Sequence, residues 1–475
     1  NQDSGFVLRG LSVNVIDPAG NSGFADRVRV DASGFGGNPA GRLRFDMSRN
    51  QTYRLRLFYQ EFKSFSALPA FANPLLDDGI VPGQHTWDRT RNVLDLQLEL
   101  PLWAKFTPIV GFRWNRYEGP GQTTYSVGND EFRLASDLEQ TESEFYVGFN
   151  FQTKALHGTL IQGWRNFDGT DRQQLATGEG VGNNPGNTLG QPVELDNFDR
   201  NNSTSADTPV TTFHMTARAS DQVRLVASYV YADTEGDASL TESLSGNLVS
   251  FQLARFFQGL DLTIDSRTVS PFSRGELRAE FDITRNIGLR GWFETRKREL
   301  SGWSMVSSLF SETLTFTGLD PRDIQVMAEA ENGYERNDEI GGLRLDFRNL
   351  GAFTVWAEYA VNNQKVGVDE DIAQIVLPGG QEGRFERRVQ FYEVGGMVDI
   401  GNGKILLDYS GQDADDVIMR TDFNDRSRIR GRIDWSFGRI ARVLGTAEVI
   451  DSNNNDSNVG YEAETTRHAI DLDLT

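Results

Sequence analysis

Charged and apolar residues alternate almost without interruption in one hairpin of this chain, SRGELRAEFDITRNIGLRGWFETRKREL at residues 273–300. In its first arm Arg278 and Glu280 share one parity, whereas Leu277, Phe281 and Ile283 share the other. Successive side chains of a β-strand point to opposite faces, so each arm has one polar face and one apolar face. The pattern predicts a two-faced strand whose apolar side meets either a protein core or lipid.

The same type of hairpin recurs along the whole chain. We count about nine, with strands close to the roughly 9–11 residues that a tilted strand needs to cross a bilayer. Clear examples are GRLRFDMSRNQTYRLRLFYQEF, SEFYVGFNFQTKALHGTLIQGWRNF, GGLRLDFRNLGAFTVWAEYAVN and RSRIRGRIDWSFGRIARVLGTAEVI, and VSFQLARFFQGLDLTIDSR is a weaker one. Helical patterns are nearly absent, and the one short helix that the sequence suggests lies around Leu319–Glu331.

Connections between these strands differ in length on the two sides. Tight turns such as SRNQ, TRNI and GNGK alternate with polar stretches of about 30, 45 and 40 residues, at Phe62–Arg91, Asp168–Thr211 and Lys297–Asn337. Short periplasmic turns and long extracellular loops are typical of outer-membrane barrels, whereas a β-sandwich mixes loop lengths at both ends. We therefore expect residues 1–475 to form an all-β, single closed antiparallel up-and-down transmembrane β-barrel of about 20–22 strands in the bacterial outer membrane.

Composition removes several classes of function. The 475-residue chain has no Cys, which excludes disulfides, thiolate zinc sites and covalent CxxCH haem attachment, so we expect no covalently bound cofactor. A net charge of −21 argues against nucleic acid as a partner. His85, His157, His214 and His468 are too scattered to build a metal or catalytic site, so we expect no enzyme.

The two ends of the sequence also carry expectations. No segment resembles the plug domain that precedes the barrel of a TonB-dependent receptor. The chain begins with Asn rather than Met, which suggests that a signal peptide is absent from the numbering. It ends in HAIDLDLT without a terminal aromatic residue, so we expect an incomplete or atypical terminus.

The two parities predict two environments. Arg at the midplane of a lipid-facing surface would cost about 2–4 kcal/mol, so the apolar parity is expected to face lipid and the charged parity a lumen. The predicted lumen-lining residues are Arg54, Arg56, Arg278, Glu280, Arg344, Asp346, Asp408, Arg428, Arg430, Arg432 and Asp434. Rings about eight residues past each short turn predict an aromatic girdle. Its members are Tyr59, Trp114, Trp164, Tyr229, Phe293, Tyr359 and Tyr409.

The sharpest electrostatic prediction concerns RSRIRGRIDW. Arg428, Arg430 and Arg432 lie about 7 Å apart along one strand, so they require carboxylates or water close by. Asp408 of the neighbouring strand and Asp434 are the expected partners within the wall. In an open pore, Arg430→Glu is expected to shift ion selectivity toward cations and to leave folding nearly intact.

One acidic stretch matches part of a calcium-binding loop. In DSNNNDSNVGYE, Asp451, Asn453, Asn455 and Glu462 occupy positions 1, 3, 5 and 12 of the pattern. Position 6 is Asp456 where the sharp turn calls for Gly, so a solvated polar loop is the simpler interpretation. Calcium in the external loops is therefore kept as an open expectation.

As a whole, the chain resembles Gram-negative outer-membrane β-barrel porins in architecture. More loosely it is similar to the MtrB/PioB-type barrels, which sheathe multihaem cytochromes, through its strand count and segments such as YRLRLFYQEFKSFSALPAF. The resemblance implies a transmembrane passage, either a porin for small polar solutes or the sheath of an electron conduit. A plugless receptor or a structural scaffold is the alternative. The implied partners are outer-membrane lipid, lipopolysaccharide and, for a sheath, a multihaem cytochrome.

Overall fold

The computed structural model of the chain describes residues 7–17, 23–36, 39–66, 70–71, 80–81, 86–101, 103, 105–127, 130–182, 192–250, 255–312, 323–373, 381–417, 422–438, 441–454 and 461–474. These residues form strands, turns and bends without a helix, so none of them belongs to a helix long and apolar enough to cross a membrane. The strands are β1 (Leu11–Ile16), β2 (Arg27–Ser33), β3 (Ala40–Arg49), β4 (Tyr53–Ser66), β5 (Ala70–Phe71), β6 (Ile80–Val81), β7 (Trp87–Glu99), β8 (Phe106–Val127), β9 (Asp130–Gln152), β10 (Leu156–Leu175), β11 (Glu194–Arg218), β12 (Val223–Ser250), β13 (Arg255–Asp282), β14 (Ile287–Glu312), β15 (Asp323–Leu350), β16 (Phe353–Ala373), β17 (Gln381–Ile400), β18 (Gly403–Ala414), β19 (Asp425–Phe437), β20 (Ala441–Asn454) and β21 (Tyr461–Leu474).

Nineteen of these strands form one antiparallel up-and-down sheet, in which each strand pairs with its neighbours in the sequence. The short strands β5 and β6 form a separate pair between β4 and β7. The all-β, up-and-down architecture predicted from the repeated hairpins is thereby confirmed. The count of 19 in the described sheet falls just below the expected 20–22.

Strand length explains the lower count. β12, β13 and β15 each run for 28 residues, far beyond the length that a bilayer requires. The weak hairpin predicted at 249–267 is the far end of β12 and β13, where Val249 pairs with Phe256 and Ser239 with Asp265.

Two stretches predicted as long loops are also largely strand. Asp168 pairs with Ser205 across β10 and β11, and β14 and β15 cover most of the range 297–337. The helix expected around Leu319–Glu331 is wrong for its described part, because residues 323–331 belong to β15. Strands that project into water need no apolar face, so these extensions lack a strict apolar parity. Because their sequences are polar throughout, they resemble loops in the sequence.

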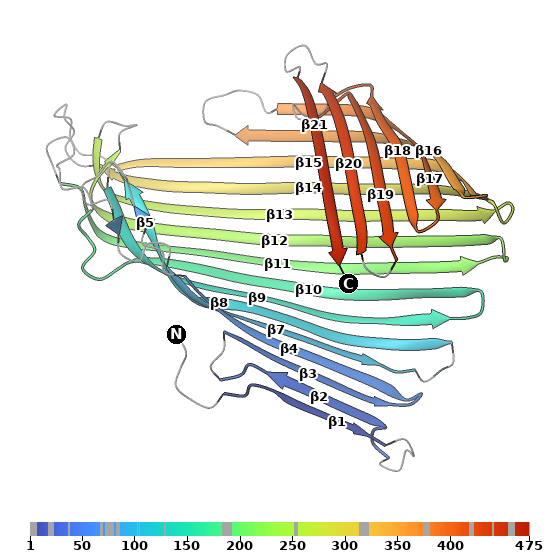
Figure 1. The fold of residues 1–475 in the computed structure, drawn as a ribbon. Helices are drawn as coiled ribbons and strands as arrows, with labels where there is room; N and C mark the ends of the chain where they lie inside the picture. Colours follow the sequence, from blue (N-terminus) through green and yellow to red (C-terminus); the bar gives the residue numbers. More distant parts are fainter. Residues whose placement is uncertain are drawn as a thin grey trace.

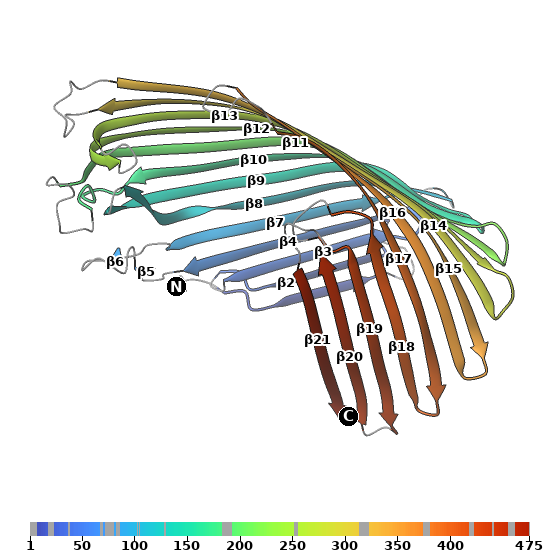
Figure 2. The ribbon, with the colours of Figure 1, turned by 90° about the horizontal axis from the view of Figure 1, so that it is seen from above.

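The sheet is strongly curved. Figures 1 and 2 show β7–β13 lying side by side, whereas β18–β21 run in a different direction. No pairing among the described residues joins β1 to β21. Because all neighbours are antiparallel, the first and last of 19 strands run in the same direction, so a direct seam between them would be parallel. Closure into a barrel stays a prediction.

The register gives the sheet one continuous apolar face. Leu277 pairs with Phe293, Gly291 with Leu343, and Leu407 with Gly396, so these side chains share one side. They are open to the surroundings: Leu277 is 55% exposed and Leu343 61%. Bands of exposed apolar side chains this large mark a surface that meets a protein partner or a membrane.

The largest buried apolar cluster lies at the far ends of the long strands, on the opposite face. Phe132 and Leu134 of β9 and Leu195 and Phe198 of β11 are at most 1% exposed. They pack with residues of β12 and β13, and the ends of β8 and β12 come into contact although they are not neighbours in the sheet. The strand extensions therefore fold over into a small packed rim.

Large rings lie over glycines of adjacent strands. A Cβ atom at Gly342 would overlap the Trp292 indole, and one at Gly395 would overlap the Trp356 indole. The glycines thus create the space in which these rings lie flat against the sheet. This packing fixes the register of the strands.

We predict that Gly342→Ala lowers the free energy of unfolding by about 1–3 kcal/mol, because the added methyl group displaces the Trp292 indole. Gly341→Ala is the matched control, since a Cβ atom there meets nothing within 4 Å. Urea unfolding followed by tryptophan fluorescence compares the two. Equal effects of the two substitutions would contradict the packing described.

The buried Tyr125 in this rim predicts that the stability of the fold falls at alkaline pH. Tyr125 packs on Phe198 with ring centroids 4.9 Å apart, and burial raises the pKa of Tyr125 to about 12. A raised pKa stabilises the fold below the ordinary value near 10, and this stability is lost as pH rises through about 12. The absorbance difference at 295 nm between the wild type and Tyr125→Phe should therefore titrate near 12, and a midpoint near 10 would be the wrong result.

Candidate functional site on the charged face

Side chains on the second face are joined by ion pairs that cross from strand to strand. Near the N-terminal side, Glu99 of β7 pairs with Arg56 and, at 3.5 Å, with Arg54, both of β4. Glu144 of β9 pairs with Arg113 of β8 at 3.2 Å and with Arg165 of β10 at 3.5 Å. In each case one carboxylate links two cations.

The middle of the sheet repeats this arrangement. Glu294 of β14 pairs with Arg274 of β13 at 2.7 Å and also with Arg296 of its own strand. Glu280 lies 3.7 Å from Arg224 of β12 and 3.6 Å from Arg290 of β14. The alternation seen in the sequence therefore becomes a network of charges that are largely satisfied within the wall.

Arg344 of β15 is the centre of a third cluster. Its guanidinium pairs with Asp346 at 3.0 Å and with Glu358 of β16 at 3.3 Å, and it lies 5.2 Å from the centroid of the Trp356 ring. The Trp356 indole N–H in turn donates to Glu393 of β17 at 2.8 Å. Three strands are thus tied together through one cation and one ring.

The most deeply buried charge of this cluster is Asp408 of β18, which is 1% exposed. Arg430 of β19 donates to one of its oxygens at 2.9 Å, and Arg428 donates to the other at 3.4 Å. The wall partner predicted for these two arginines is confirmed. Asp434 behaves differently, because it pairs with Arg442 of β20 at 2.6 Å.

The register places all eleven predicted lumen residues on this one face, and ten of them make ion pairs with other residues of the wall. The exception is Arg432, which is exposed and has no ion pair among the described residues. Sequence reasoning missed most of the carboxylates that complete the pairs. Cross-strand register was the signal that could have found them: Glu358 lies opposite Arg344, and Glu99 opposite Arg54. That this face lines a lumen stays a prediction.

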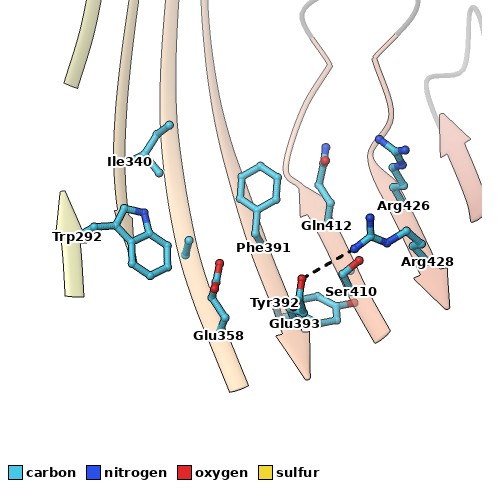
Figure 3. A pocket seen from close by; sticks show the side chains of 12 residues that line it. Trp292, Ile340, Glu358, Phe391, Tyr392, Glu393, Ser410, Gln412, Arg426 and Arg428 are labelled. Atoms are coloured by element: carbon cyan, nitrogen blue, oxygen red, sulfur yellow. Dashed lines mark ion pairs between the residues drawn. The ribbon is translucent and has the colours of Figure 1, made fainter. Parts of the chain in front are cut away.

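A shallow groove of about 400 Å³ crosses the charged face between β14 and β19 (Figure 3). Trp292 and Ile340 lie at one end, and Arg426 and Arg428 at the other. Ser410 and Gln412 of β18 lie opposite Arg428 and Arg426 in the register. An apolar wall thus leads into a group of hydrogen-bond donors.

The seven predicted girdle rings all lie on the apolar face. Sequence reasoning missed two rings beside them: Tyr392 pairs directly with Tyr359, and Phe145 with Trp164. The Tyr392 ring lies 6.0 Å from that of Tyr409, and the Phe145 and Trp164 rings stack at 6.1 Å. A girdle at the membrane interface remains the prediction that these positions support.

The calcium candidate is an extended hairpin in its described part. Asp451 and Asn453 belong to β20, Glu462 of β21 pairs with Asn453, and Asn455 lies outside the described residues. Ligands of a calcium loop curl around one point, which two extended strands do not do. No group of three His, Cys, Asp or Glu residues in the described part of the chain is arranged to hold a metal. Calcium binding by external loops stays a prediction.

Asp408 yields a stability prediction. Asp408→Asn should lower the free energy of unfolding by about 1–3 kcal/mol, since Arg428 and Arg430 lose their shared counter-charge. Asp434→Asn is the control: its pair with the half-exposed Arg442 should contribute less than about 1 kcal/mol. Urea unfolding in lipid vesicles measures both, and equal losses would refute the role of burial.

The buried carboxylate also changes what we expect of Arg430→Glu. The sequence alone suggests nearly intact folding, but the new carboxylate would lie beside Asp408, which is 1% exposed. Like charges in contact at a buried site are destabilising. We therefore expect Arg430→Glu to impair folding, and Arg432→Glu to be the better probe of selectivity.

No family model matches the chain, and no curated protein sequence matches it. Among solved structures, the ferric yersiniabactin uptake receptor FyuA from Yersinia pestis is similar, with 11% identity, 91% of this chain and 67% of that chain covered, and a TM-score of 0.47. The FrpB iron transporter from Neisseria meningitidis has 9% identity, coverages of 92% and 72%, and a TM-score of 0.42. The Pseudomonas putida toluene transporter TodX has 11% identity, coverages of 78% and 89%, and a TM-score of 0.29. With TM-scores below 0.5, these similarities do not establish a family or a function for the chain.

Proposed function

We propose that this chain is the wall of a bacterial outer-membrane β-barrel that provides a water-filled passage for small polar solutes. The observation that carries the proposal is the separation of the two faces across the strands of the sheet. One face exposes apolar side chains, and the other is a network of ion pairs.

The apolar face supports contact with lipid. Its exposed residues extend across strands from β8 to β21, including Val110, Leu277, Leu343, Leu407 and Ile470. A second protein that covered so many strands would have to surround the sheet, whereas a lipid bilayer surrounds any barrel embedded in it. Apolar strand faces of this kind form the outer band of transmembrane barrels.

The charged face supports an open passage more than a sheath. Ten of its eleven predicted residues have counter-charges in the wall itself, so a partner protein is not needed to neutralise them. Most arginines remain about 30–60% exposed, as expected for ion pairs that keep contact with water. A sheath around a multihaem cytochrome, a plugless receptor and a structural scaffold are the competing functions.

Reconstitution into planar lipid bilayers tests the proposal. We predict stable, ohmic single-channel steps, because a wall with a hydrated polar face conducts ions when it closes. Protein that inserts and folds but stays electrically silent would contradict an open passage and favour a barrel filled by a partner.

The same bilayers test which face lines the passage. Arg432→Glu replaces an exposed cation that forms no ion pair among the described residues, so it should shift the reversal potential in a salt gradient toward cation selectivity. Leu407→Gln, on the apolar face, is the control and should leave selectivity unchanged. An unchanged reversal potential for Arg432→Glu would place that residue outside the passage.

A further inference from the structure

The groove on the charged face changes in composition from one end to the other. One row of directly paired residues crosses six strands: Trp292, Gly342, Ala360, Phe391, Gln412 and Arg426. The row changes from aromatic and small residues to an amide and a guanidinium. Its two ends are therefore chemically different, as a site for a ligand with an apolar end and a charged end would require.

The cationic end contains one guanidinium, that of Arg426, that forms no ion pair within the described wall. The Arg426 guanidinium carbon lies 5.5 Å from the centroid of the Phe423 ring. Arg428 beside it pairs with Asp408 at 3.4 Å and lies 3.9 Å from Glu393 (Figure 3), while its buried Nε atom has no hydrogen-bond partner in the described structure. The Ser410 hydroxyl and the Gln412 amide line the groove opposite these two arginines.

The apolar end exposes hydrocarbon on the charged face. Phe391 is 37% exposed there, between the buried Ala360 and Gln412. Trp292 lies over Gly342, and Ile340 lies beside it in the groove (Figure 3). An exposed ring on a water-facing wall gains free energy when an apolar ligand covers it.

We propose that this groove binds an organic monoanion, with its carboxylate on Arg426 and Arg428 and its flat apolar body on Phe391. The inference rests on the proposed function and names a class of solute for the passage. Strands lie about 4.8 Å apart, so Arg426 and Phe391 are separated by about 10 Å of wall. A single ring joined to a carboxylate by a short spacer fits this separation.

Two carboxylates in the groove limit the negative charge that a bound ligand can carry. Glu358 and Glu393 lie between the two ends, where Arg344 and the Trp356 N–H hold them at 3.3 Å and 2.8 Å. They repel a second negative charge placed on the apolar part of the ligand. The groove therefore favours a monoanion with its charge at one end over a dianion with a charge at each end.

Isothermal titration of the folded protein in detergent with 3-phenylpropionate tests the site without requiring conductance. We expect saturable binding that Arg426→Gln and Phe391→Ala each weaken about tenfold or more. The alcohol 3-phenylpropanol and acetate should each bind at least tenfold more weakly, because each lacks one half of the ligand. Arg54→Gln, which removes a cation from the same face at the opposite side of the sheet, should bind like the wild type.

The site is refuted if the acid and the alcohol bind equally or if Arg426→Gln leaves affinity unchanged in folded protein. Gln412→Ala provides a second variant that tests the same end without changing charge, with a smaller loss expected. Binding by a protein that is silent in bilayers would uphold the site and refute the passage. Ohmic conductance without binding of 3-phenylpropionate would uphold the passage and refute the site.

Discussion

The antiparallel register keeps the charged and the apolar side chains of this sheet on separate faces. A shift of one residue in any strand would move its charges to the apolar face and its apolar side chains to the charged face. On the charged face, both the ion pairs and the Trp356 ring oppose such a shift. Arg430 and Arg428 reach Asp408 only in the observed register, and the Trp356 indole fits only where Gly395 lies opposite it.

The ion pairs define the register rather than supply much of the stability. Exposed pairs such as Arg54 with Glu99 contribute little individually, because water competes for both partners. Asp408 differs because its side chain is buried between two guanidiniums. Removing one partner of this buried contact would lower the stability substantially. Although most pairs in the wall are weak, positions such as Asp408 therefore fix the alignment of β17–β19.

Sequence alone predicted the features that follow from period-2 alternation. The hairpins, the tight turns and the face assigned to each charged residue all follow from parity, which the register between Leu277 and Phe293 confirms. Prediction from the sequence failed where charged and apolar residues no longer alternate. The ends of β12–β15 look like loops because they are polar, and the rim cluster around Phe132 and Phe198 joins strands that are far apart in the sequence. The groove depends on which residues align across six strands, and single-strand patterns do not contain that information.

Accessibility along the hairpin at residues 274–283 tests the two-faced wall most directly. The chain has no Cys, so single cysteines carrying a spin label can be introduced one at a time into protein folded in lipid vesicles. We predict strict alternation: labels at 277, 279 and 281 should collide mainly with lipid-soluble oxygen, and labels at 276, 278 and 280 mainly with a water-soluble nickel chelate. If labels at 277, 279 and 281 were shielded from both reagents, the apolar face would be packed against protein, and the account of a membrane wall would be contradicted.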